Sequence, residues 1–155
     1  MHLLLFLKTC PDFLAPENID KIISAELPPP TCQKNIDLAE IIQTITIHGP
    51  CGPQFPRSPC MIGNENQMGA YSKSYPKAFC ETTVVQENGY HQYRWRNNEA
   101  SFSVPLRNGL PGATFEVDNR WVVPYNPYLS WKYKAHINVE ISASIKAIKY
   151  IHQYI

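Results

Sequence analysis

A fold that combines α-helices with β-strands is predicted by three features of this 155-residue sequence. Apolar residues recur at helical spacing in two early segments, alternate with polar residues in residues 135–141, and flank a tight-turn signal near residue 88. A hydrophobic content of 44% and a charged content of 17% fit one folded domain and exclude a disordered protein. The 14 prolines predict long irregular connections between the elements.

The first part of the chain predicts one strand and two helices. The apolar run of residues 2–7 is typical of a strand buried on both faces, and it is too short to span a bilayer. Pro16 suits the first turn of a helix, which would end before the prolines at 28–30. A second helix is predicted over 36–47. Its expected packing face consists of Ile36, Leu38, Ile41, Ile42 and Ile45. Both helices are interpreted as scaffold.

Residues 48–80 form a loop-rich insertion that contains His48, Cys51, Cys60 and Cys80. Histidine and cysteine at such spacings can bind zinc, which would stabilise a segment with little core of its own. The alternative is that the thiols are buried and free and that the histidine caps a neighbouring element. The 5 cysteines lack regular spacing, so they predict reduced thiols in an intracellular protein rather than a disulfide framework.

A hairpin is predicted between residues 82–85 and 90–96, because Glu87, Asn88 and Gly89 make a good tight turn. On the second strand Arg94 and Arg96 share one face and alternate with aromatic residues. Arginine beside aromatic rings suits contact with single-stranded DNA, whereas the alternative is an ordinary solvated hairpin. The net charge of +1 gives no support for nucleic-acid binding, so DNA contact would need a local patch.

The segment after residue 120 predicts two more strands. Residues 121–123 are typical of a short strand, and 124–127 of a turn. Residues 135–141 alternate strictly, so His136, Asn138 and Glu140 are expected on one face of a strand. Such a face can place a metal ligand or a general base near a nucleophile, or it can simply be solvated.

The end of the chain predicts a helix with one apolar stripe and one polar face. The stripe consists of Ile141, Ile145, Ile148, Ile151 and Ile155. The opposite face carries Lys146, Tyr150 and Tyr154 at successive turns. Tyrosines four residues apart usually belong to a surface or to the rim of a core. They can also act as nucleophiles.

Several motifs occur in the order found in the nuclease domain of Helitron rolling-circle transposases, the Helitron helicase-like domain, which this chain resembles. They are HLLLFL, PENIDKIISAELP, IHGPCG, SPCM, YPKAF and the long segment DNRWVVPYNPYLSWKYKAHINVEISASIKAIKYIHQY, and together they cover nearly the whole chain. The resemblance implies a HUH endonuclease with an α+β fold, in which helices pack against a central, mainly antiparallel sheet. It also implies single-stranded DNA as the partner and a nuclear location. The helicase motor of the family lies downstream, and this sequence has no phosphate-binding Gly-x-x-x-x-Gly-Lys motif.

The resemblance also assigns roles to individual residues. His2 matches the second histidine of a His-x-His pair that holds magnesium or manganese, and the first would lie before Met1, so the fragment is expected to be truncated inside this motif. Tyr150 or Tyr154 would attack a DNA phosphate and remain attached to its 5′ end. Because tyrosine has a pKa of about 10, the metal, Lys146 and Lys149 are candidates to help it ionise.

Two departures from the family leave other functions open. Tyr71 stands where the family usually has a cysteine, and Gln153 stands where it commonly has a lysine. One alternative is a catalytically inactive transposon remnant that at most binds DNA. Another is a small zinc-dependent interaction module built on residues 48–80.

Overall fold

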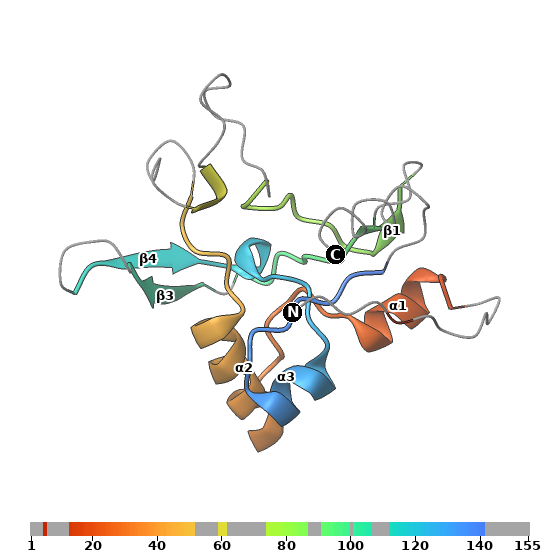
Figure 1. Cartoon of the computed structure of the whole chain (residues 1–155), viewed down its shortest axis with the longest axis horizontal. Helices are drawn as coiled ribbons and strands as arrows, with labels where there is room; N and C mark the ends of the chain where they lie inside the picture. The colour runs from red at the N-terminus through yellow and green to blue at the C-terminus, as the bar shows by residue number, and fades with distance from the viewer. Residues whose placement is uncertain are drawn as a thin grey trace.

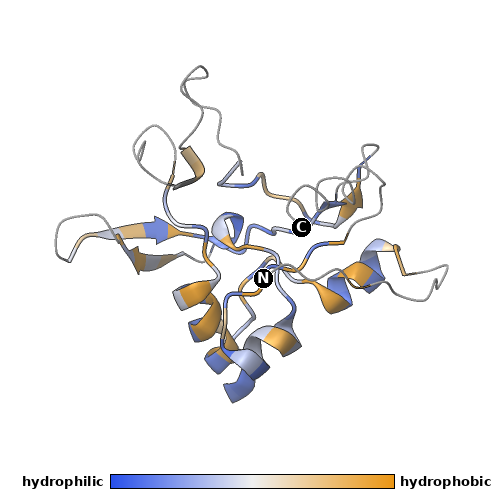
Figure 2. Ribbon diagram, in the orientation of Figure 1, coloured by the Kyte–Doolittle hydropathy of each residue, from blue (hydrophilic) through white to orange (hydrophobic). Residues whose placement is uncertain are grey.

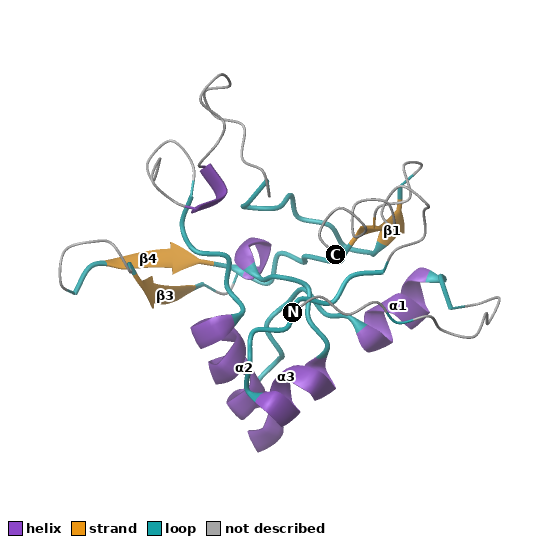
Figure 3. Cartoon of the chain, viewed as in Figure 1, coloured by secondary structure: helices purple, strands orange, loops and turns teal. Residues whose placement is uncertain are grey.

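The computed structural model describes residues 5, 13–51, 59–61, 74–86, 91–99, 101–106 and 112–141. Its helices are α1 (Pro16–Ile22), α2 (Gln33–Ile45) and α3 (Pro127–Tyr133), with 3-10 turns η1 (Pro59–Met61) and η2 (Asn119–Trp121). Its strands are β1 (Val84–Val85), β2 (His91–Gln92), β3 (Phe102–Pro105) and β4 (Thr114–Val117). Long loops join these short elements, as the prolines predicted (Figures 1 and 3).

The described strands form two separate antiparallel hairpins. Strand β1 pairs with β2, so the hairpin predicted around residue 88 is confirmed. Strand β3 pairs with β4, with Phe102 opposite Val117. Helices combined with small antiparallel sheets place the protein in the α+β class. Within the described residues there are two two-stranded sheets rather than the single central sheet that we expected.

The two predicted helices are confirmed, with one change in the packing face of α2. Helix α1 begins at Pro16, which occupies its first turn, and α2 begins three residues earlier than predicted. In α2, Leu38 and Ile42 are buried, but Ile36 is 46% exposed. The apolar side of α2 is visible in Figure 2. Ile36 was therefore wrongly assigned to the core, because the buried stripe passes through the positions at 38 and 42.

The stretch from 119 to 126, the central segment, holds remote parts of the chain together. Its carbonyl groups accept hydrogen bonds from the backbone N–H groups of Ser24, His48 and Lys77 at 2.8–3.0 Å. The predicted strand at 121–123 is wrong, because Trp121 ends the 3-10 turn η2 and only Val122 forms an isolated bridge. The side chain of Asp118 caps that turn, which favours a helical turn over an extended start.

Three small clusters of buried residues surround the central segment. The first contains Ile19, Ile23, Ala25, Tyr93 and Trp95. The second contains Cys51, Tyr75, Val104, Val117 and Trp121. The third contains Leu38, Ile42, Val122 and Tyr125. Because the central segment supplies residues to two of these clusters, its placement decides how they sit together.

Residues 135–141 alternate as predicted but do not form a regular strand. His136, Asn138 and Glu140 are exposed, whereas Ile137, Val139 and Ile141 are half-buried. Val139 and Ile141 pack against the cluster around Trp95, and the N–H of Val139 donates to the carbonyl of Pro124 at 3.0 Å. Lys134 ends α3 with a left-handed backbone (φ 47°) and so turns the chain into this segment. In the described ranges, no helix is long and apolar enough to cross a membrane.

Candidate metal centre and cleft

His48, Cys51 and Cys60 lie together, with the ligand atoms of all three within 4.8 Å of one another. His48 and Cys51 follow α2, and Cys60 comes from the turn η1. The backbone N–H of His48 donates to the carbonyl of Trp121 at 2.8 Å, which fixes this loop on the central segment. The turn η1 therefore brings a third potential ligand, Cys60, close to His48 and Cys51.

Tyr75 supports this cluster from the next described segment. Its ring stacks on the imidazole of His48, with centroids 4.2 Å apart and planes 15° apart. Its carbonyl accepts a hydrogen bond from the thiol of Cys51 at 3.6 Å. Burial, and secondarily the charge of Glu140, raise the pKa of the Tyr75 hydroxyl well above its usual range. Tyr75 is thus a neutral packing surface here and not an acid–base group.

The surroundings of Cys51 oppose its ionisation. Burial, together with the hydrogen bond and charge of Cys60, raises the pKa of the Cys51 thiol to about 12. A thiol of this kind stays protonated unless a cation compensates for the thiolate charge. Two thiols and one imidazole form a donor set that suits zinc, whereas magnesium and calcium prefer oxygen ligands. The three residues therefore fit a zinc ion chemically.

Cys80 is not part of this group of three. Its backbone exchanges two hydrogen bonds with Trp95, each 2.9 Å long, and its thiol donates to the carbonyl of Thr82 at 2.9 Å. These bonds hold Cys80 beside the β1–β2 hairpin. Its position is therefore decided by its pairing with Trp95 and not by its spacing from the other cysteines. Tyr71, which stands where the family has a cysteine, lies outside the described residues.

A cleft of about 1850 Å³ opens beside the cluster. His48 and Cys60 line it, as do residues 134–136 and Asn138 and Glu140. Its charged lining residues, within the described chain, are Lys77, Lys134 and Glu140. The polar side of residues 135–141, predicted from their alternation, thus faces an open cavity large enough for an extended ligand.

Two further histidines, His91 and His136, line the cleft in different surroundings. The Nδ1 atom of His136 lies 2.7 Å from the carbonyl oxygen of Ile45. Since a carbonyl only accepts, the Nδ1 atom is the donor of this hydrogen bond. Burial lowers the pKa of His91, although a backbone interaction with Ile141 opposes this effect. His91 was missed in the sequence, where nothing except its place in a short strand marks it.

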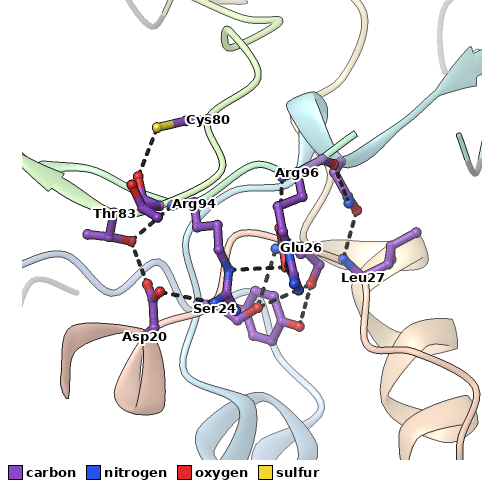
Figure 4. Close-up of polar contacts among 11 residues, drawn as sticks. Asp20, Ser24, Glu26, Leu27, Cys80, Thr83, Arg94 and Arg96 are labelled. Carbon is purple, nitrogen blue, oxygen red and sulfur yellow. Dashed lines mark hydrogen bonds and ion pairs between the residues drawn. The ribbon is translucent and has the colours of Figure 1, made fainter. Parts of the chain in front are cut away.

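Arg94 and Arg96, predicted to contact DNA, are both engaged in ion pairs (Figure 4). Arg96 forms a two-pronged pair with the carboxylate of Glu26, with its shortest N···O distance at 2.8 Å. Arg94 pairs with Asp20 at 3.1 Å and lies 3.5 Å from Glu26. These arginines join the β1–β2 hairpin to α1 and to the segment after it. Contact with DNA stays a prediction, and it would have to coexist with these pairs.

Glu26 is the acidic centre of this network. Burial alone would raise the pKa of Glu26, but hydrogen bonds and charge from Arg96, together with the charge of Arg94, outweigh burial and lower it. The hydroxyl of Tyr125 donates to the Glu26 carbonyl at 2.8 Å. The side chain of Asn119 accepts from the N–H of Leu27 and donates to the carbonyl of Arg96, both at 3.0 Å. The central segment therefore fixes both partners of the main ion pair.

The residues to which the resemblance assigns chemistry lie outside the described ranges. They are His2, Lys146, Lys149, Tyr150 and Tyr154. Their roles stay predictions.

Comparison with known families gave no match to this chain. A search of curated proteins likewise gave no match.

Proposed function

We propose that the chain is part of a Helitron-type nuclease domain that cleaves and rejoins single-stranded DNA through a tyrosine. Two observations support this proposal: the motifs occur in the family's order along nearly the whole chain, and the segment that leads into the tyrosines lines a cleft. The cleft carries the proposal, because Lys77 and Lys134 on its lining offer positive charge for phosphates.

In the proposed reaction the oxygen of Tyr150 or Tyr154 attacks the phosphorus of the scissile phosphate. The bond from phosphorus to the 3′ oxygen of the upstream nucleotide breaks, and that oxygen leaves with a proton. The tyrosine is then joined to the 5′ phosphate of the downstream strand. Lys146 would stabilise the phenolate of the attacking tyrosine, and a divalent ion held at His2 would polarise the phosphate when bound.

The test is formation of a covalent protein–DNA adduct. Because the family's metal pair is His-x-His, one histidine is added directly before Met1, and the chain is mixed with a 3′-labelled single-stranded oligonucleotide and manganese. The label is expected to migrate with the protein in a denaturing gel. The double variant Tyr150→Phe and Tyr154→Phe should lose it, whereas the matched control Tyr71→Phe should keep it.

Other outcomes of this experiment separate the alternatives. Binding of the oligonucleotide without any adduct would overturn cleavage and support the inactive remnant. An adduct that survives in the double tyrosine variant would show that another residue attacks.

We also propose that His48, Cys51 and Cys60 hold a structural zinc ion. The proposal is supported by three ligand atoms within 4.8 Å of one another and by the burial of Cys51. His48 and Cys60 line the cleft, so a water molecule could supply the fourth ligand that zinc requires. When bound, the ion would join η1 to the loop after α2, a connection that the chain otherwise makes through few buried side chains.

Zinc content measured on the purified chain tests this site directly. One zinc per chain is expected, and Cys51→Ser or Cys60→Ser should reduce the content at least tenfold. The matched controls are Cys32→Ser, which changes an exposed thiol, and Cys80→Ser, which changes the thiol beside the hairpin. Loss of zinc in Cys80→Ser would contradict the three-residue site, and absence of zinc from the unaltered chain would overturn the proposal.

A further inference from the structure

Helix α3 lies beside α2 (Figure 1) and exposes three large aromatic side chains. Tyr128 and Tyr133 are each 58% exposed, and Trp131 is 39% exposed. These three rings, together with Lys34 of α2 and Lys132 of α3, are named here the aromatic–lysine patch. Rings of this size are normally buried or paired at an interface, so a patch of them suggests a ligand.

The lysines of the patch lie over its rings. The amino group of Lys34 lies 4.9 Å from the ring centre of Trp131, which links α2 to α3. The amino group of Lys132 lies 5.5 Å from the ring centre of Tyr128 and 5.2 Å from that of Tyr133. Cation–π attraction thus holds positive charge against exposed aromatic faces. A ligand that touches the rings also meets the charges.

The local charge around α3 is positive although the whole chain is nearly neutral. From residue 127 to 139 the sequence contains two lysines, Lys132 and Lys134, but no aspartate or glutamate. Helix α2 carries Asp37 and Glu40, and the Asp37 carboxylate accepts a hydrogen bond from Gln33. The patch therefore suits a partner that is both anionic and rich in flat rings.

We propose that the aromatic–lysine patch binds single-stranded nucleic acid. Unpaired bases stack on Trp131 and Tyr128, and Lys34, Lys132 and Lys134 contact the phosphates. A single strand is favoured over a duplex, because bases already stacked inside a duplex cannot lie against protein rings. Lys134 follows α3 directly and also lines the cleft, so a strand on the patch can continue into the cleft. This binding does not depend on cleavage by Tyr150 or Tyr154.

The experiment measures binding of a fluorescent dT12 oligonucleotide by anisotropy. Trp131→Ala is expected to weaken binding at least fivefold, since stacking on one aromatic ring contributes about 1–3 kcal/mol per base. Tyr128→Ala should act in the same direction. The matched control is Phe79→Ala, which removes a ring that is 38% exposed and also lies against a cation, the guanidinium of Arg120, but outside the patch.

Salt dependence tests the lysines separately. Three phosphate contacts on a single strand predict that log Kd rises with log salt with a slope of about 2. Lys132→Gln should reduce that slope by about 0.7, whereas Lys21→Gln on α1 should leave it unchanged. Binding is measured without a divalent metal ion, so this result is separable from failure of the cleavage assay.

Several results would overturn the proposal. Binding that Trp131→Ala and Tyr128→Ala leave unchanged would place the nucleic acid elsewhere. Equal affinity for a duplex of the same length would remove the stacking argument. A dimer that dissociates in Trp131→Ala, without nucleic-acid binding, would show that the patch contacts a second copy of the chain.

Discussion

Glu26 concentrates the polar contacts of the first part of the chain at one buried carboxylate, which is 7% exposed. Replacing Glu26 with glutamine is expected to lower the free energy of unfolding by about 1.5–3 kcal/mol, the range for hydrogen bonds to charged groups. The loss should stay below that of a fully buried pair because the Arg96 side chain is 50% exposed. Urea unfolding at pH 7 measures it, with the exposed Glu40→Gln as a control that should change little.

The pH dependence of this loss follows from the lowered pKa of Glu26. A carboxylate whose pKa is lower in the folded state stabilises the fold fully above its unfolded pKa, about 4.3, and less as the pH falls through the folded value. The difference between the unaltered chain and Glu26→Gln should therefore be complete at pH 7 and shrink in acid. A difference that is the same at pH 3 and pH 7 would contradict the ion-pair account.

At the scale of elements, Asn126 joins two helices through one side chain. Its oxygen accepts from the N–H of Leu129 at 2.9 Å and caps α3, while its amide nitrogen donates to the carbonyl of Ile22, at the end of α1, at 2.8 Å. Asn126→Ala removes both bonds and should cost about 1–3 kcal/mol. Asn126→Asp keeps the cap but loses the donor. Its midpoint of thermal unfolding should therefore lie between those of the unaltered chain and Asn126→Ala. Equal stability of the alanine and aspartate variants would show that the cap contributes nothing.

Elements whose signals are local could be predicted from the sequence. Proline at the first turn identified α1, the apolar stripe identified α2, and the turn near residue 88 identified the first hairpin. The hairpin of β3 and β4 was missed, because strands of four residues carry too little periodicity. The segment at 121–123 was assigned to a strand because it is a short apolar run, but Trp121 lies in a turn and Val122 forms a single bridge.

The candidate site could be predicted only in part, because tertiary contacts decide which of its residues meet. The sequence suggested His48, Cys51, Cys60 and Cys80 as ligands, and the first three lie together because η1 returns to the loop after α2. Tertiary bonds carry Cys80 to the hairpin instead, and no spacing rule contains that information. Likewise, the partners of Arg96 lie 70 residues away in the sequence, so the ion pairs could not be foreseen.

At the scale of the whole molecule, the described residues form three small clusters in place of one large core. If zinc binds at His48, Cys51 and Cys60, its removal by a chelator should loosen the cluster that contains Cys51 and Trp121 first. Hydrogen exchange followed by mass spectrometry should then show faster exchange around Cys51 and Trp121. Exchange around Ile19 should change less, and a uniform change across all three clusters would indicate one cooperative unit.

The position of the central segment also has a consequence for synthesis. Its bonds to the first third of the chain span 92 to 104 residues, from Leu27 to Asn119 and from Ile22 to Asn126. Translation adds about 5–20 residues per second, so α1 and α2 must wait several seconds on the ribosome before their partners emerge. During that interval their apolar sides are open to chaperones and proteases, and the yield of folded protein depends on how well they are shielded.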